Sequence, residues 1–193
     1  MTCSKLLTGA ALASLISVAA YAHSGATGVV KERMDGMDAM KASMKLLAPM
    51  MQGQTPYDAA VVREEAQTIQ THAGEVLTGL FPKGTDGHPS DAKPEIWADW
   101  EGFADLALQL ETYSEGLALA AENGLMMAGA EGTGMMSSGA MMGATAMGAG
   151  GMMGGQMMGG PRSAEALQQM PAGAVFTMLS QTCSACHTRF RKE

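Results

Sequence analysis

Four stretches of the chain repeat apolar residues in steps of three and four, which is the spacing of one helix face. The first runs over residues 30–51 and is ended by Gly53 and Pro56. Its apolar side consists of Val30, Arg33, Met37, Met40, Met44, Leu47 and Met51. The pattern predicts an amphipathic helix that carries one arginine among its apolar positions.

The second predicted helix begins at Thr55, which has the features of an N-cap residue. Pro56 follows as the first helical residue and Asp58 as the acid of a capping box. The apolar face of this helix consists of Val62, Ala66, Ile69, Ala73, Val76 and Leu80. Residues 81–98 are rich in Pro, Gly and Asp, which predicts a loop.

The third predicted helix spans residues 99–122 and stops at Asn123 and Gly124. Its buried positions are Phe103, Leu106, Leu110, Tyr113 and Leu117. The fourth runs from about Pro171 to about Arg191, and Phe176, Leu179, Cys183 and Cys186 recur along one side. Strand patterns are nearly absent, so the sequence predicts an all-α fold, a four-helix bundle with one long connection.

That long connection, residues 124–161, consists mostly of Gly, Met, Ala and Ser and contains five methionine pairs. Glycine at this density makes a regular helix costly, so we expect a flexible Met/Gly-rich insertion between helices three and four. Thioethers are soft ligands that select Cu(I), which gives the hypothesis of copper binding by the insertion. The alternative is a low-complexity spacer whose methionines exclude water or scavenge oxidants.

The first residues have the pattern of a secretory signal peptide. Lys5 supplies the positive charge, residues 6–19 the apolar region, and Ala20-Tyr21-Ala22 the cleavage site. The apolar region is too short to span a bilayer. We therefore expect a signal peptide at residues 1–22 and a single mature domain at 23–193, soluble and periplasmic.

The charge balance excludes one class of partner. The chain has 12 Lys and Arg, and removal of Lys5 with the signal leaves 11 against 19 Asp and Glu. Nucleic-acid binding needs a high density of basic residues, so this acidic chain is not expected to bind nucleic acid.

Two cysteines remain in the mature chain, Cys183 and Cys186, and His187 follows directly. Cys-x-x-Cys-His is a signal for covalent attachment of a c-type haem. On a helix the three side chains share one face, because they are offset by three and four residues. Both thiols can then form thioethers with one porphyrin edge, while the imidazole of His187 points at the iron. We expect one haem c.

Three other interpretations of the motif were weighed. A thioredoxin-like dithiol opens a helix after a strand, whereas this motif lies at the end of a helical chain. A structural zinc site needs four ligands, and the chain has no second cysteine pair. A simple disulfide has no need of His187, although the spacing alone does not exclude it.

With these features the chain resembles the class II c-type cytochromes, the cytochrome c′ family. The most specific match is the haem motif near the C-terminus, and the resemblance covers nearly the whole mature chain except the insertion. Shorter matches are the residues 30–33, 53–60, 81–84 and 92–97. The resemblance implies a left-handed antiparallel bundle with haem between the helices, often a homodimer. It also implies that Arg33 lies near the haem propionates and that Arg191 flanks the proximal face.

The resemblance leaves two possibilities for the sixth iron ligand. Most cytochromes c′ leave that position vacant, so small gases bind there. A low-spin branch places a methionine four residues after the arginine, which is Met37 in this chain, with Met40 as the substitute candidate. A methionine stripe is otherwise typical of core packing. His72 lies off the apolar stripe of helix two, which predicts a surface position.

The sequence thus predicts a periplasmic electron carrier whose single haem is ligated by His187 and Met37. Its redox partners are not identified by the sequence. The alternatives are a five-coordinate protein that binds nitric oxide or carbon monoxide, and a copper-handling protein that acts through the insertion. We found no hydrolytic triad, nucleotide loop or paired catalytic carboxylates, so no enzymatic activity is expected.

Overall fold

The computed structural model describes residues 25–125 and 162–193. The predicted signal peptide and nearly all of the Met/Gly-rich insertion lie outside these ranges. Export and Cu(I) binding by the insertion therefore stay predictions. Within the described ranges, no helix is long and apolar enough to cross a membrane.

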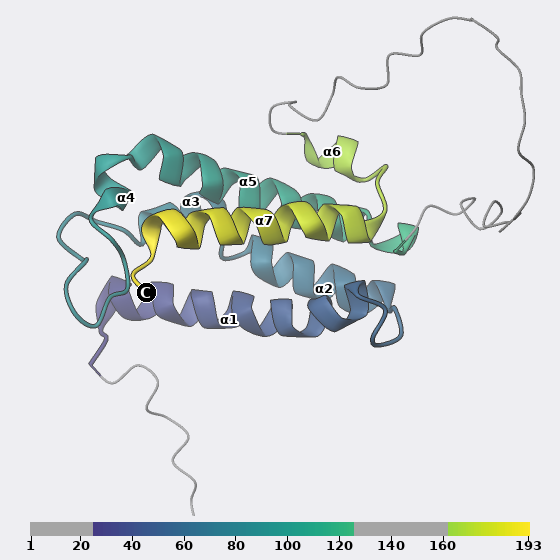
Figure 1. The fold of residues 1–193 in the computed structure, drawn as a ribbon, viewed down its shortest axis with the longest axis horizontal. Helices are drawn as coiled ribbons and strands as arrows, with labels where there is room; N and C mark the ends of the chain where they lie inside the picture. Colours follow the sequence, from purple (N-terminus) through teal and green to yellow (C-terminus); the bar gives the residue numbers. More distant parts are fainter. Residues whose placement is uncertain (1–24, 126–161) are drawn as a thin grey trace, which may run out of the picture.

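Four long helices form the bundle: α1 (Gly28–Met51), α2 (Ala59–Gln70), α5 (Trp100–Leu119) and α7 (Ala172–Phe190). Shorter elements are α3 (Gly74–Gly79), α4 (Glu95–Ala98), the 3₁₀ turn η1 (Ala121–Asn123) and α6 (Ala164–Leu167). Successive long helices run in opposite directions, as Figure 1 shows. Both α2 and α7 pack along α5, and α1 packs against α2. The predicted all-α antiparallel four-helix bundle is confirmed.

The second helix begins later than the sequence predicts. Asp58, not Thr55, is the N-cap of α2, because its Oδ1 accepts hydrogen bonds from the amides of Ala60 (2.9 Å) and Val61 (3.2 Å). A carboxylate that satisfies two free amides at a helix start also opposes the positive end of the helix dipole. The prediction of Thr55 as N-cap is therefore wrong.

The predicted second helix is also broken into α2 and α3. Gly74 has a φ of +58°, a left-handed conformation that favours glycine, and α3 restarts there in a new register. As a result Leu77 is 3% exposed and Val76 is 57% exposed, the reverse of the predicted pattern. The predicted 81–98 loop likewise contains the short helix α4.

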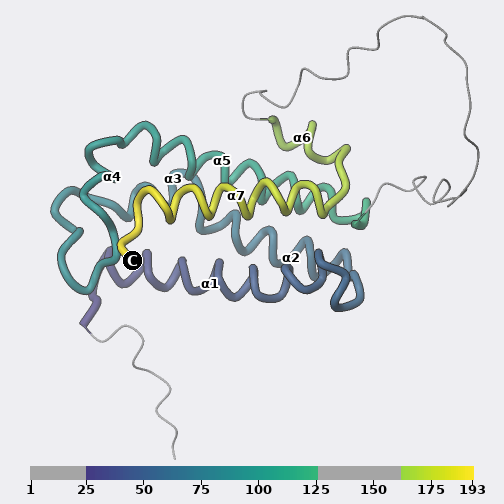
Figure 2. Tube along the Cα trace, viewed as in Figure 1, coloured from purple at the N-terminus to yellow at the C-terminus, as the bar shows by residue number. Residues whose placement is uncertain are grey.

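The buried side chains form two clusters, a main core and an aromatic cluster. Figure 2 traces the helices to which most of their residues belong. The main core is mostly aliphatic and includes Leu47, Val62, Ile69, Leu117 and Leu179. The aromatic cluster consists of Leu77, Phe81, Ala92, Ile96, Phe103, Ala107 and Phe190. Both contain positions that the helical patterns mark as apolar, such as Leu110 and Phe103, but also positions that the patterns missed, such as Leu167 and Leu77.

Two sets of hydrogen bonds join distant parts of the chain. At the C-terminus, Arg191 forms an antiparallel bridge with Ala92, and the amide of Lys93 donates to Phe190 O (2.9 Å). At the start of α7, the amide of Ala172 donates to Gly124 O at 2.9 Å. Asn123 Nδ2 also donates to Gln168 O and Met170 O, each at 2.7 Å. These contacts hold both ends of α7 against earlier segments.

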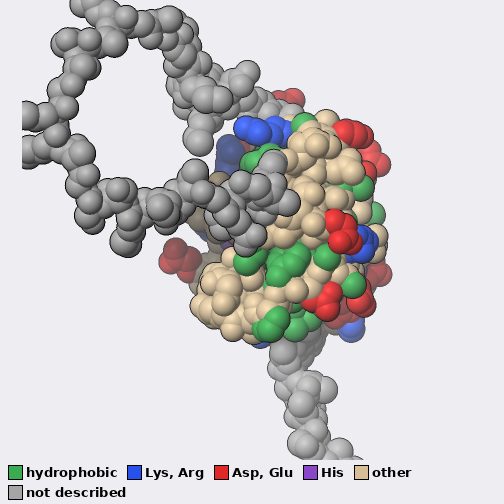
Figure 3. Space-filling model, turned by 90° about the vertical axis from the view of Figure 1, so that its right-hand side faces the viewer, with side chains coloured by type: hydrophobic (Ala, Val, Ile, Leu, Met, Phe, Trp, Pro, Cys, Tyr) green, Lys and Arg blue, Asp and Glu red, His purple; other side chains and the backbone are tan. Residues whose placement is uncertain are grey.

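The surface is acidic, in keeping with the net charge of −7. Figure 3 shows the end of the bundle at the right of Figure 1, where acidic side chains lie scattered over the polar surface. The basic side chains on this face do not gather into one patch. Nothing on this face suggests a nucleic-acid interface.

Candidate functional site

A cavity of about 590 Å³ lies between α1 and the C-terminal end of α7. From α1 it is lined by Arg33, Met34, Met37, Asp38 and Lys41, and from α7 by Cys186, His187, Phe190 and Arg191. Its volume falls within the range of about 300–1,000 Å³ that is usual for ligand and cofactor sites. Five of the six predicted site residues therefore meet in one cavity.

Three aromatic rings form the inner wall of this cavity. Phe103 packs edge to face against Phe81, with ring centroids 4.8 Å apart, and against Phe190 at 5.5 Å. Ala92 and Ile96 complete the apolar lining. Such rigid, apolar walls suit a flat, apolar ring system.

Charged side chains line the same cavity from α1 and from the end of α7. Lys41 is exposed, and Arg191 is exposed with its guanidinium 3.7 Å from the carboxylate of Asp91. Asp38 lines the cavity as well. Cations at the opening of an apolar cavity can pair with carboxylates of a bound group.

The motif side chains of α7 reach both buried clusters. Cys183 packs against the main core and Cys186 against the aromatic cluster, and both are free thiols. Burial raises the pKa of Cys183, and burial together with Cys183 raises the pKa of Cys186 to about 11. Both thiols are therefore protonated at neutral pH in the polypeptide.

His187 is exposed toward the cavity that it lines. Its pKa is lowered, first by burial of the ring and then by the charge of Arg191. The lowered pKa favours the neutral imidazole, which is the form that can bind a metal ion.

Arg33 is 4% exposed and holds the segment between α3 and α4 against α1. Its guanidinium donates to Leu80 O (3.2 Å), Thr85 Oγ1 (2.9 Å), Thr85 O and Ser90 Oγ. It also lies over the ring of Phe81, at 4.5 Å from the centroid. Burial lowers the pKa of Arg33, which Asp86 opposes. The arginine that the sequence places among apolar positions is thus a buried residue of the cavity wall, and its hydrogen bonds join α1 to residues 80–90.

The methionines of α1 separate into two groups. Met34 and Met37 line the cavity, and Met37 packs against both buried clusters. Met40 is 8% exposed within the main core and does not line the cavity, so it is a poor candidate for a ligand there. The register against Arg33 favours Met37 over Met40, and of these two only Met37 lines the cavity. Ligation by Met37 stays a prediction.

His72 corrects one sequence prediction, because it is half-buried rather than a surface residue. A Cβ added at Gly36 would lie 3.2 Å from His72 Nδ1, so the imidazole lies close against α1. It does not line the cavity. The sequence analysis also missed the cavity residues Met34, Lys41 and Phe81. Of these, only Lys41 could have been found from the sequence, because it lies four residues after Met37 on the same helix face.

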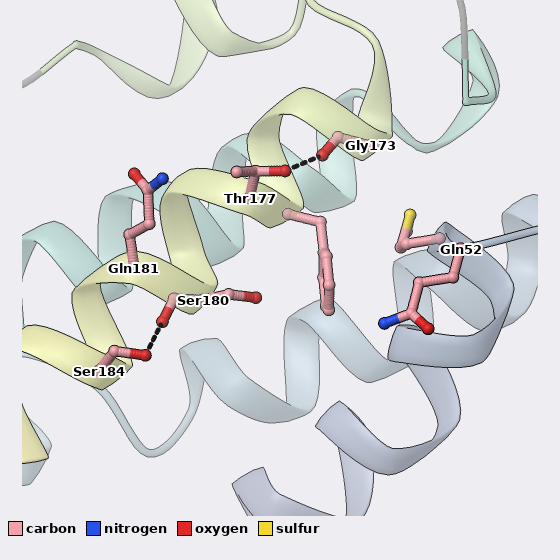
Figure 4. A pocket seen from close by; sticks show the side chains of 8 residues that line it. Gln52, Gly173, Thr177, Ser180, Gln181 and Ser184 are labelled. Carbon is pink, nitrogen blue, oxygen red and sulfur yellow. Dashed lines mark hydrogen bonds between the residues drawn. The ribbon is translucent and has the colours of Figure 1, made fainter.

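A second cavity, of about 430 Å³, lies between the end of α1 and the first half of α7 (Figure 4). The hydroxyls of Thr177 and Ser184 donate to the carbonyls of Gly173 (2.8 Å) and Ser180 (3.0 Å), as the dashed lines show. No charged or titratable side chain lines it. The groups able to hold a cofactor are in the first cavity.

An antiparallel helical bundle with a Cys-x-x-Cys-His motif beside an apolar cavity with cations at its edge is a fold and site of the c-type haem proteins. The sequence profile of the family described as Cytochrome C' matches residues 28–138, more than half of the chain. The chain therefore belongs to the cytochrome c′ family, and its cofactor is haem c. The match ends before α7, which bears the motif.

Individual relatives agree with this assignment. A cytochrome c′ of Alcaligenes xylosoxydans xylosoxydans is 30% identical over 95 residues, which cover 49% of this chain and 72% of the relative. A cytochrome c-556 of Agrobacterium fabrum is 36% identical over 87 residues, covering 45% and 58%. The crystal structure of cytochrome c′ from Thermochromatium tepidum has the same fold, with a TM-score of 0.54 and 22% identity over 86% of this chain and 95% of that one.

The residues of the cavity fit haem c by their chemistry. The two motif thiols lie on one side of α7, an imidazole faces the cavity, and the walls are aromatic. Arg191 and Lys41 are cationic side chains of the lining, able to pair with the carboxylates of a bound group. Of the predicted site residues, Cys183 and Met37 also pack against the main core.

Proposed function

We propose that this protein is a periplasmic electron carrier with one haem c attached through Cys183 and Cys186. In this proposal His187 and Met37 would ligate the iron. The observation that carries it is that Met37, on α1, lines the same cavity as His187, on α7. Haem c supplies a single-electron couple, and a His/Met ligand pair raises its potential.

The packing of Met37 supports a ligand role. Its side chain contacts the main core and the aromatic cluster, so its position is fixed from two sides. A preorganised ligand that stays in place in both oxidation states keeps structural change small during electron transfer. The thioether is a soft donor, which suits ferrous iron.

Two arginines and one lysine are proposed to bind the propionates or flank the proximal face. Arg33 lies at the wall, where its guanidinium is already held by the segment between α3 and α4. Arg191 follows His187 by one helical turn and lines the cavity. Lys41 lines it from α1. Asp38 and Asp91 line the same cavity, so these five charged side chains have a net charge of +1, which favours the two propionates.

The predicted signal peptide at residues 1–22 supports a periplasmic location for the mature protein. This is the compartment in which c-type haem is expected for an exported chain with a Cys-x-x-Cys-His motif. We further propose that the protein works with a separate redox protein and, as the family resemblance implies, forms a homodimer.

The visible spectrum of the holoprotein tests this proposal. We expect a low-spin ferric spectrum with a weak sulfur-to-iron band in the far red, and a mass that exceeds the mature polypeptide by one haem. Met37→Ala should give a high-spin ferrous form that takes up carbon monoxide. Met40→Ala, which removes a methionine of the main core, should leave the spectrum unchanged. A wild-type spectrum in Met37→Ala would show that Met37 is not the ligand.

The second candidate function is gas binding by a five-coordinate haem. It is supported by relatives named cytochrome c′ and by a solved nitric oxide complex of a mutant cytochrome c prime from Alcaligenes xylosoxidans, 22% identical with a TM-score of 0.55. In that case Met37 would be a wall residue and the wild-type ferrous protein would bind carbon monoxide rapidly. The same carbon monoxide titration therefore separates the two functions.

A further inference from the structure

Trp100, the first residue of α5, is 41% exposed. Of the Phe, Tyr and Trp side chains in the described ranges 25–125 and 162–193, it is the only exposed one. Large exposed aromatic side chains are unusual on a small acidic protein, and tryptophan is enriched among the residues that dominate binding energy at protein interfaces. Trp100 is therefore a candidate contact residue for a partner protein.

One buried ring separates Trp100 from that cavity. The centroids of Trp100 and Phe103 are 5.6 Å apart, and Phe103 is 1% exposed. Phe103 lines the cavity and also contacts Phe190, three residues after His187. Figure 1 shows the start of α5 and the end of α7 at the same end of the bundle. A partner in contact with Trp100 would thus lie one ring away from the cofactor site.

The surroundings of Trp100 are apolar in the centre and acidic at the edge. Trp100, Ala104 and Leu108 follow one another at helical spacing on α5, and Leu108 is 56% exposed. Glu101 and Asp105, which follow Trp100 and Ala104 on α5, are exposed, as is Glu95 on the preceding helix α4. We call Trp100, Ala104 and Leu108 with these three acids the Trp100 surface.

Two basic side chains near this surface are Arg189 and Lys93. Arg189 forms an ion pair with Asp99, the N-cap of α5. Lys93 Nζ donates to the carbonyl of Thr188 at 3.2 Å and keeps its positive charge. The three acids outnumber Lys93, so the Trp100 surface has a net negative charge, in a chain whose net charge is −7.

We propose that the Trp100 surface is the docking site of a basic redox protein that exchanges one electron with the haem. The inference rests on the electron-carrier function proposed above. Positive side chains of the partner would face Glu95, Glu101 and Asp105, and its apolar contact would cover Trp100. A second copy of this chain is disfavoured there, because its own acids would oppose them. In the exchange the ferrous haem loses one electron and the oxidised partner gains it.

Stopped-flow oxidation of the reduced holoprotein tests the docking site. The probe is mitochondrial ferricytochrome c, a basic haem protein, at low ionic strength. Trp100→Ala is expected to lower the second-order rate constant about tenfold, because it removes the central contact. Leu119→Ala is the matched control, since Leu119 is 42% exposed at the far end of the same helix. Its rate constant should stay within about twofold of the wild type, the scale of surface substitutions away from a contact.

The charge of the surface is tested separately by Glu101→Lys, which leaves Trp100 in place. Its rate constant should fall at low salt and approach the wild-type value at high salt, where the charges are screened. Oxidation by ferricyanide, a small trianion, should be the same in Trp100→Ala, Leu119→Ala and the wild type, and at high salt also in Glu101→Lys.

The outcomes distinguish the two proposals. Equal rates with ferricytochrome c for Trp100→Ala and Leu119→Ala, or no effect of Glu101→Lys at low salt, would overturn the docking site while leaving the electron carrier intact. A wild-type holoprotein that exchanges electrons slowly with both oxidants would overturn the electron carrier. The test depends on the ratio of the rate constants of each variant and the wild type. If Trp100→Ala does not fold, Glu101→Lys still tests the docking site.

Discussion

The two buried clusters of the bundle serve different purposes. The main core is closed: Leu47, Leu117 and Leu179 are all 0% exposed, and flexible aliphatic side chains fill its space. The aromatic cluster is packed on one side and open on the other, where Phe81 and Phe190 face the haem cavity. Aliphatic side chains fill gaps, whereas stiff rings in contact with one another can wall a cavity without collapsing into it.

The helix α1 shows the same difference within a few turns. Met40 belongs to the closed core, while Met37, less than one turn earlier, reaches the cavity. Arg33 lies beyond it and is held at the cavity wall by four hydrogen bonds. One helix therefore contributes both to stability and to the site, and single substitutions along it separate these roles.

The largest effects are expected from truncations inside the two clusters. Leu117→Ala and Phe103→Ala should each lower the free energy of unfolding by about 2–5 kcal/mol, because both side chains are buried. Only Phe103→Ala should also change the haem spectrum, since only Phe103 lines the cavity. Guanidinium unfolding and visible spectra of both holoproteins check this. A spectral change in Leu117→Ala would remove the distinction between the clusters.

A smaller effect is expected at the cavity wall. Arg33→Leu leaves the carbonyls of Leu80 and Thr85 without their donor and should destabilise the protein by about 1–3 kcal/mol. The amides of residues 81–92 should then exchange hydrogen faster than those of α2. Lys31→Leu is the control, because Lys31 is exposed and pairs only with Asp35 in the same helix. Equal protection of residues 81–92 in both variants would show that Arg33 does not hold this segment against α1.

The smallest effect is expected at the edge of the main core. Tyr57 packs against this core and its hydroxyl donates to Ala121 O at 2.6 Å. Tyr57→Phe should cost about 0.5–1.5 kcal/mol at neutral pH. Burial raises the pKa of Tyr57, so its contribution is complete below the unfolded pKa of about 10 and is lost as the pH rises through the higher folded value.

Unfolding curves at neutral pH and above pH ~10 check this sign. The wild type should lose more stability than Tyr57→Phe over that interval. The haem spectrum should be the same for both, because Tyr57 does not line the cavity. A larger loss of stability in Tyr57→Phe than in the wild type would contradict a raised pKa for Tyr57.

The helices were predictable because their buried positions recur with helical spacing. Phe103, Leu110, Leu117 and Leu179 are buried as predicted. The break between α2 and α3 was not predictable, because apolar residues continue through it at helical spacing. At the break Gly74 takes a positive φ, and a Cβ there would lie 2.0 Å from Glu111 Oε2 on α5. Such a contact between helices leaves no trace in a one-dimensional pattern.

The sequence predicted the motif residues, Arg33 and Met37 as site residues, but it did not predict the other residues that line the cavity. The haem motif, Arg33 and Met37 follow from spacing and family resemblance. The partners of Arg33 do not, because Thr85 and Ser90 lie more than fifty residues away in a segment without periodicity. The same holds for Phe81 and Ala92, which reach the cavity only when the end of α7 pairs with that segment.

The hydrogen bonds that join Asn123 and Gly124 to the residues just before α7 have a consequence for the length of the chain between them. They fix the two ends of the intervening connection close together, independently of its number of residues. The entropy of closing a connection rises slowly with length, by about 0.6 kcal/mol for each doubling. A change in the length of this connection is therefore expected to cost little stability.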